Sequence, residues 1–150
     1  MKKLLTVLLI FVLSIGVLPS DPVLARNKVN LKPTWDNIYL LAKAMWAENR
    51  GSSDEAVFLT GIVVCQRVRA NCYPDTIKGV LSQKGQYATW INGQIQSCEP
   101  DERCIELAEE ILRFKLYKDY PHNLVFQAQF KQGIKVYKYF KKYGEYFCLA

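Results

Sequence analysis

The stretch from Trp35 to Val68, WDNIYLLAKAMWAENRGSSDEAVFLTGIVVCQRV, decides the fold because it predicts two helices joined by a very short turn. The first helix is expected from Trp35 to about Asn49. Thr34 suits the N-cap position, and Gly51 suits the left-handed residue just past a helix end.

The second helix is predicted to begin at Ser52, because Glu55 stands three residues later in the spacing of a capping box. Apolar residues then recur at the helical period as far as about Asn71. The residues of this apolar face are Val57, Phe58, Gly61, Ile62, Cys65 and Val68.

Glu48 conflicts with the amphipathic pattern of the first helix. At about 100° per residue, it falls inside the apolar arc between Leu41 and Ala44. A carboxylate there is costly unless it is paired or neutral, and burial raises its pKa toward the range of a general acid. Trp46 and Arg50 are close enough in the sequence to line such a site and to orient the Glu48 carboxyl group. The alternatives are a frayed last turn that exposes Glu48 to water, or a simple ion pair with Arg50.

The middle of the chain predicts one more long helix. A short helical turn is expected over 76–81, and the polar segment 82–97 is expected to be a loop or a weak hairpin. The helix is predicted from Pro100 to about Lys115, with proline and acidic residues in its first turn. Its inward residues would be Ile105, Ala108, Ile111 and Leu112.

The C-terminal part predicts strands. From Leu124 to Phe130 the apolar residues alternate with others at period two, and the tail from Val136 to Cys148 is aromatic and strand-prone. Tyr143-Gly144 marks a turn within that tail. Helices first and strands last indicate an α+β domain with a small antiparallel sheet.

The N-terminus has the pattern of a secretory signal. Two lysines precede the apolar run 4–18, and Val23-Leu24-Ala25 resembles a cleavage site. We expect cleavage after Ala25, and an uncleaved anchor is the alternative. Residues 26–33 would be a short lead-in and 34–150 one domain. With Lys+Arg 20 against Asp+Glu 14, the chain is basic at +6.

The cysteines and the single histidine limit the chemistry. Outside the cytosol disulfides persist, but five cysteines are an odd number, so at least one is free or pairs with another molecule. A disulfide bridge could join Cys98 to Cys104, and Cys72 lies in a loop where a bridge could also form. Buried free thiols are the alternative. One His argues against zinc, which in catalytic sites usually takes two or three imidazoles, so no metal or cofactor is expected.

Met45–Gly51, MWAENRG, resembles the aromatic-Ala-Glu-Ala-Arg-Gly motif of one family, the spore-cortex-lytic, SleB-like cell-wall hydrolases. Ile62–Val68, IVVCQRV, is similar to its VVLNRV segment, and Tyr73–Val80, YPDTIKGV, to its FPNTIKGVI. Gln86-Tyr87 stands where the family has Gln-Phe. The four matches occur in the family's order and spacing.

The resemblance implies a lysozyme-like α+β catalytic domain that cuts peptidoglycan glycan strands, with Glu48 as the essential acid. The family's chemistry resembles lytic transglycosylation, in which the acid protonates the glycosidic oxygen and the muramic 6-hydroxyl then closes onto the anomeric carbon. One carboxyl group suffices because the substrate supplies the nucleophile, unlike the two-carboxylate scheme of most glycosidases. A second catalytic carboxyl group that works with Glu48, such as that of Glu145, is the alternative.

The C-terminal third departs from the family pattern. Phe126-Gln127-Ala128 stands in place of an aromatic-aromatic-Asn-Pro strand, and no His stands near the chain end. Phe126 and Gln127 are still expected to bind substrate from the sheet side. The departure leaves open a second hypothesis, a catalytically silent peptidoglycan-binding domain of the same fold.

Gln86, Tyr87 and Trp90 are the expected sugar contacts in the polar segment, because aromatic rings stack on sugar faces. Rings packed back on the core are the alternative. A cysteine peptidase using Cys65 or Cys72 with His122 is a third hypothesis, which the apolar helical surroundings of Cys65 disfavour.

The expected partners are peptidoglycan glycan strands and the anionic wall, with no nucleic acid. The protein would act as a monomer, secreted or in the bacterial cell envelope. A solvated run of lysines would be attracted to the wall. These are Lys131, Lys135, Lys138, Lys141 and Lys142.

Overall fold

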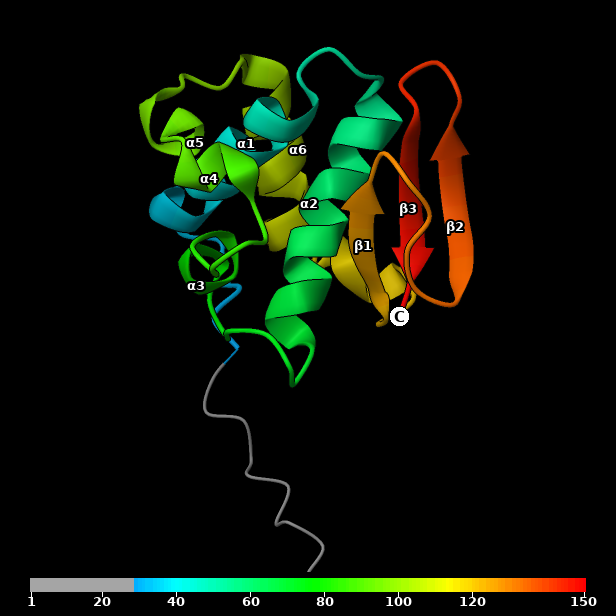
Figure 1. The fold of residues 1–150 in the computed structure, drawn as a ribbon. Coiled ribbons are helices and arrows are strands. Elements are labelled where there is room, and N and C mark those ends of the chain that lie inside the picture. Colours follow the sequence, from blue (N-terminus) through cyan, green and yellow to red (C-terminus); the bar gives the residue numbers. More distant parts are fainter. Residues whose placement is uncertain (1–28) are drawn as a thin grey trace, which may run out of the picture.

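The computed structural model describes residues 29–150, so the expected signal segment lies outside the described residues. Helices come first and strands last (Figure 1), which confirms the predicted α+β class. The helices are α1 (Trp35–Asn49), α2 (Asp54–Arg69), α3 (Ile77–Leu81), α4 (Ala88–Ile91), α5 (Gln94–Ser97), α6 (Glu102–Arg113) and the 3-10 helix η1 (Leu116–Asp119). The strands are β1 (Leu124–Ala128), β2 (Lys135–Phe140) and β3 (Glu145–Leu149).

Helix α1 has the predicted bounds, but its end differs from the prediction. Thr34 is the N-cap, and its hydroxyl accepts a hydrogen bond from the Asn37 amide at 3.4 Å. Gly51 does not adopt the predicted left-handed conformation. The chain instead continues in a right-handed turn, with Arg50 at φ −53° and the Ser52 amide bonded to the Asn49 carbonyl at 2.9 Å.

Helix α2 begins one residue later than predicted, since Ser53 and not Ser52 is the N-cap. The Ser53 hydroxyl accepts from the Ala56 amide at 3.4 Å, so the predicted capping box of Ser52 and Glu55 does not form. The helix ends at Arg69, two residues before the predicted limit.

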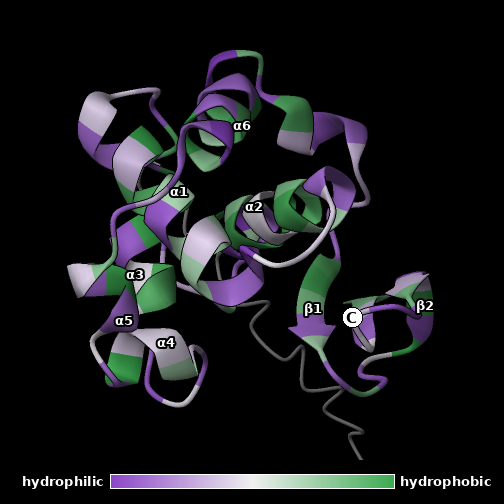
Figure 2. Cartoon of the chain, turned by 90° about the horizontal axis from the view of Figure 1, so that it is seen from above, coloured by the Kyte–Doolittle hydropathy of each residue, from purple (hydrophilic) through white to green (hydrophobic). Residues whose placement is uncertain are grey.

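Helix α2 is buried on nearly every side, so the single apolar face predicted for it was too narrow. It lies between the other long helices and the sheet (Figures 1 and 2). Even its polar residues are internal: Gln66 donates to the Tyr117 carbonyl at 2.6 Å, and Arg67 donates from Nε to the Val125 carbonyl at 2.7 Å. A helix hydrophobic all round is typical of the centre of a domain.

Helices α1, α2 and α6 meet closely at Gly61. A Cβ atom at this position would lie 2.6 Å from Ile111 Cδ1 and 2.9 Å from Met45 Sδ. The absence of a side chain therefore lets α2 approach its two neighbours. Helix α6 itself starts later than predicted, because Asp101 is its N-cap and Pro100 precedes the helix.

The segment 82–97 is not the predicted loop or hairpin but contains two short helices, α4 and α5. Gly93, at φ +80°, joins them, and the Asn92 side chain accepts from the Gln94 amide at 3.0 Å. Helices of four residues are too short to show a period in the sequence. The predicted helical turn at 76–81 is confirmed as α3, with Thr76 as its N-cap.

The sheet has the order β1-β3-β2, and both pairings are antiparallel. The predicted turn at Tyr143-Gly144 is confirmed, with Gly144 at φ +67°. Register pairs Gln127 with Phe147, on the face that carries the core, and pairs Phe126 with Cys148 on the other face. The C-terminal strand is therefore central, and its core-facing residues are fixed from both sides.

Residues before α1 are attached to the domain. Asn30 forms a parallel bridge with Thr76, its amide donates to the Asp75 carbonyl at 2.8 Å, and Leu31 is buried. All five cysteines are free thiols, and only Cys72 is exposed. Within residues 29–150, no helix is long and apolar enough to span a membrane.

Candidate active site

A cleft of about 510 Å³ lies where the end of α1 faces the turn between β2 and β3. Glu48, in the last turn of α1, is half-buried in its wall. Most of the lining side chains are polar. The lining residues are Ala47, Glu48, Asn49, Arg50, Gly51, Ser52, Gln94, Gln129, Tyr143 and Glu145.

The surroundings of Glu48 raise the pKa of its carboxyl group, as the sequence predicted. Burial is the main cause, because removal from water disfavours the charged form. Two contacts oppose it: the Thr89 hydroxyl donates a hydrogen bond to Glu48 Oε1, and the buried Arg67 guanidinium favours the carboxylate. Glu48 is thus more readily protonated near neutral pH than an ordinary glutamate, which is what a general acid requires.

A second carboxyl group, Glu145, lines the same cleft from the start of β3. Its Oε1 accepts hydrogen bonds from Gln127 Nε2 at 2.7 Å and Asn49 Nδ2 at 3.0 Å. Its pKa is also raised, mainly by burial and further by the negative charge of Glu48. Most glycosidases use two carboxyl groups that lie in one cleft.

Asn49 connects the elements that carry these acids. Its Nδ2 donates to Thr60 on α2 at 2.7 Å and to Glu145 on β3 at 3.0 Å, and its Oδ1 accepts from the Ser52 hydroxyl at 2.9 Å. This buried amide therefore fixes the end of α1 relative to α2 and the sheet.

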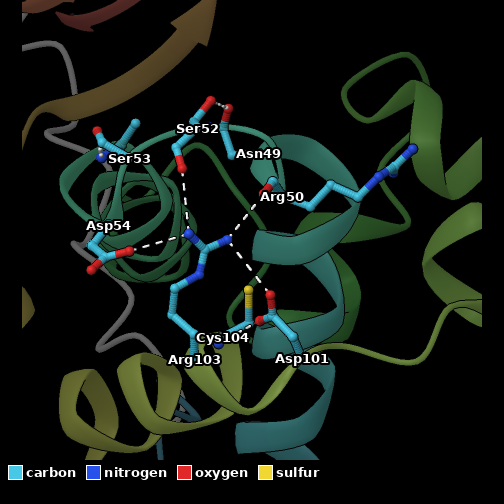
Figure 3. Close-up of polar contacts among 9 residues, drawn as sticks. Asn49, Arg50, Ser52, Ser53, Asp54, Asp101, Arg103 and Cys104 are labelled. Atoms are coloured by element: carbon cyan, nitrogen blue, oxygen red, sulfur yellow. Dashed lines mark hydrogen bonds and ion pairs between the residues drawn. The ribbon is translucent and has the colours of Figure 1, made fainter.

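Arg103 of α6 holds the turn that follows Glu48 (Figure 3). Its guanidinium donates to the Arg50 carbonyl at 3.0 Å and the Ser52 carbonyl at 3.4 Å, and it pairs with Asp54 at 3.1 Å. The Arg50 side chain points away from this contact and lies over the Trp46 ring, 4.6 Å from its centroid. Among the described residues Arg50 forms no ion pair, so the predicted alternative of a Glu48–Arg50 pair is not observed.

Of the residues predicted from sequence, Glu48 and Arg50 line the cleft directly. Trp46 lies beneath the Arg50 guanidinium, and Gln127 reaches the cleft through its bond to Glu145. Phe126 is on the opposite face of the sheet from Gln127, because neighbouring strand residues point to opposite sides.

The polar segment contributes differently from the prediction. Tyr87 is only 6% exposed, so its ring is not available to a sugar, and it lies against the Arg67 guanidinium, 5.1 Å from the ring centroid. Burial raises the pKa of Tyr87 to about 12. Gln86 is exposed but does not line the cleft, and Trp90 is half-buried against the core.

Several residues of the site had no signal in the sequence. Thr89 and Gln94 come from the short helices α4 and α5, and Gln129 follows the end of β1, so their positions depend on the whole fold. Asn49 was not singled out either, and Glu145 was named only as an alternative partner of Glu48, because their contact forms only when the chain folds.

The surroundings of Cys65 do not favour the thiol chemistry of a cysteine peptidase. Cys65 is fully buried, and burial raises the pKa of its thiol, which opposes formation of a nucleophilic thiolate. Within 29–150, no group of three or more His, Cys, Asp or Glu is placed to hold a metal ion. The arrangement suits acid–base chemistry by carboxyl groups.

Comparisons with known proteins bear on the family and on the fold. A family model described as Cell Wall Hydrolase matches residues 51–146, a segment that begins just after Glu48. No curated protein matches the chain.

Two solved structures have a similar fold. The catalytic domain of the germination-specific lytic transglycosylase SleB from Bacillus anthracis is 18% identical, with a TM-score of 0.58, over 77% of this chain and 95% of that one. The catalytic domain of the Bacillus cereus SleB protein is 17% identical, with a TM-score of 0.56, over 77% and 91%. The predicted lysozyme-like fold is thereby confirmed.

Proposed function

Because this chain belongs to the cell wall hydrolase family and is an enzyme acting on peptidoglycan, we propose that it cleaves the glycan strands by lytic transglycosylation, with Glu48 as the general acid. The observation that carries the proposal is the position of Glu48: half-buried, protonated more readily than usual and open to a polar cleft. The likeness to the SleB catalytic domains supports the reaction class.

In the proposed reaction, Glu48 donates its proton to the glycosidic oxygen as the bond from that oxygen to the anomeric carbon breaks. The muramic 6-hydroxyl oxygen then bonds to the same carbon and passes its proton to the Glu48 carboxylate, which leaves an anhydro end and restores the acid. The Thr89 hydroxyl orients the Glu48 carboxyl group through its hydrogen bond. Arg50, held over Trp46, lies at the cleft where it can meet the carboxylates of the glycan substituents.

Other predicted contacts have secondary roles in this proposal. Gln127 holds the Glu145 carboxyl group in place through their hydrogen bond. Trp90 is one residue from Thr89 and supports the segment that carries the Thr89 hydroxyl. Gln86 is exposed on the segment before α4 and contacts the glycan strand outside the cleft. Phe126, on the other face of the sheet from Gln127, and Tyr87, which is buried, serve packing.

The test is release of soluble muropeptides from purified peptidoglycan by the wild type and by Glu48→Gln, analysed by mass spectrometry. Loss of a general acid reduces the rate by about 10²–10⁴-fold. Glu106→Gln, an exposed acid on α6, is the matched control and should retain the wild-type rate. Anhydro ends support the proposed reaction, and reducing ends indicate hydrolysis instead. Binding to sacculi with no release by the wild type would favour the silent wall-binding hypothesis.

We also propose that the protein is exported, with the mature chain starting at Arg26. The basis is the lysine pair, apolar run and small residues of 1–25. N-terminal sequencing of the protein recovered from the envelope or medium tests this. A start at Met1 would mean that the segment is retained.

A further inference from the structure

Glu145 is a buried acid in the wall of the cleft, and one of its carboxyl oxygens has no hydrogen-bond partner among the described residues. The residue is 8% exposed, and both amide donors, from Asn49 and Gln127, bind the same oxygen, Oε1. Oε2 is buried and has no hydrogen-bond partner among the described residues. Unpaired buried polar atoms are uncommon in folded proteins and call for an explanation such as a missing ligand or a catalytic role.

The charged and titratable groups around Glu145 are few. Glu48 and Arg50 line the same cleft from the end of α1, and Tyr143 lines it from the β2–β3 turn. Of these groups, Glu48 acts on the charge of Glu145. On the neighbouring strand β2, Lys138 is engaged with Glu55 of α2 at 2.8 Å, and β1 carries no charged residue. The nearest strong electrostatic influence on Glu145 is therefore the other acid of the cleft.

We propose that Glu145 is the second catalytic carboxyl group, whose Oε2 accepts the proton of the hydroxyl that attacks the anomeric carbon. This inference rests on the proposed glycan cleavage and replaces its single-carboxyl scheme with two acids of divided roles. The two amide bonds hold Oε1 in place, so Oε2, in the wall of the cleft, is the carboxyl oxygen that has no partner and can take up a proton.

The assignment of base and acid follows from the hydrogen bonds. Two N–H donors on Glu145 Oε1 favour its carboxylate form, whereas Glu48 accepts a single bond from a hydroxyl. Acid and base roles in paired carboxyl groups are set by differences of this kind. Glu48 is then the group that carries the proton at the start of the reaction.

The step is balanced. The Glu48 proton passes to the glycosidic oxygen, which keeps the electron pair of the breaking bond to the anomeric carbon. The muramic 6-hydroxyl oxygen forms the new bond to that carbon, and its proton passes to Glu145 Oε2. The enzyme ends with Glu48 ionised and Glu145 protonated, and exchange with water restores the starting state.

The experiment is the pH dependence of kcat/KM for muropeptide release by the wild type, Glu145→Gln and Glu145→Asp. The wild type should give a bell-shaped profile, because Glu145 must be ionised and Glu48 protonated. Glu145→Gln keeps an oxygen that accepts from the two amides, but it should abolish the acid limb, which is the fall in kcat/KM at low pH. The maximal rate should fall by about 10²-fold or more. Glu145→Asp should keep an acid limb, and Glu106→Gln should match the wild type.

Each outcome decides between the proposals. A wild-type profile without an acid limb over the range in which the fold stays intact by circular dichroism would overturn the role of Glu145. So would a Glu145→Gln variant that keeps both the limb and the rate. Either result would leave Glu48 as the acid of the proposed function. Failure of the wild type to release any muropeptide would instead overturn the proposed function and this inference with it.

Discussion

The Thr89 hydroxyl donates a hydrogen bond to Glu48 Oε1 across 41 residues of sequence. This contact joins α4, a helix of only four residues, to the last turn of α1. It lowers the pKa of Glu48 and so opposes the effect of burial. A short element with no sequence signal of its own thus adjusts the ionisation of the proposed acid.

Replacing Thr89 by Val should move the alkaline limb of the activity profile to higher pH. The hydroxyl bond stabilises the carboxylate, so its loss raises the pKa of Glu48 further and keeps the acid protonated at higher pH. The measurement is kcat/KM against pH. Ser97→Ala, which removes a hydroxyl bonded to the Gly93 carbonyl, is the control and should leave the limb unmoved. An unchanged limb in Thr89→Val would contradict the role of this bond.

Replacing Arg103 by Met should destabilise the protein by about 1–3 kcal/mol, because the Arg50 and Ser52 carbonyls lose their donor. Urea unfolding measures the change. Arg113→Met on the same helix breaks only an exposed pair with Glu109, worth about 0–1 kcal/mol. Equal effects of the two substitutions would show that Arg103 does not hold the turn after Glu48.

Replacing Gly61 by Ala should destabilise the protein by about 1–3 kcal/mol through overpacking. The new methyl group would lie 2.6 Å from Ile111 Cδ1 and 2.9 Å from Met45 Sδ, and both of these side chains are fully buried in the core. Gly51→Ala is the matched control, since nothing lies within 4 Å of its Cβ position and its φ is not in the left-handed region. Thermal unfolding compares the two, and a stable Gly61→Ala variant would mean that α1 and α6 can move apart.

Glu145→Gln should be more stable than the wild type at pH 7, although less active. The folded-state pKa of Glu145 is raised, so the folded protein binds this proton more tightly than the unfolded chain does. Stability is then lost as pH rises from the unfolded pKa, about 4.3, through the raised folded value. The difference in Tm between variant and wild type should therefore be positive at pH 7 and shrink toward pH 4. A difference independent of pH would contradict the ionisation of Glu145.

Local sequence patterns predicted the long elements because each pattern repeats over several turns. Thr34 and the apolar spacing defined α1, and the alternation after Leu124 located β1. Prediction failed where few residues decide the outcome. The Ser52–Ser53 choice of N-cap, the right-handed turn at Gly51 and the two four-residue helices depend on contacts with distant segments, such as Arg103 on the Arg50 carbonyl.

Local sequence patterns were enough to predict the α+β order of elements, the resemblance to a cell wall hydrolase family and the anomalous place of Glu48 on an apolar helix face. Each of these depends on residues close together in the chain. The surroundings of Glu48 follow from the folded chain alone, because Thr89, Asn49, Gln127 and Glu145 come from four separate elements. The tertiary structure also decided that Tyr87 is buried and that Phe126 lies on the other face of the sheet from Gln127, since packing and strand register, and not residue type, set which side chains a substrate can reach.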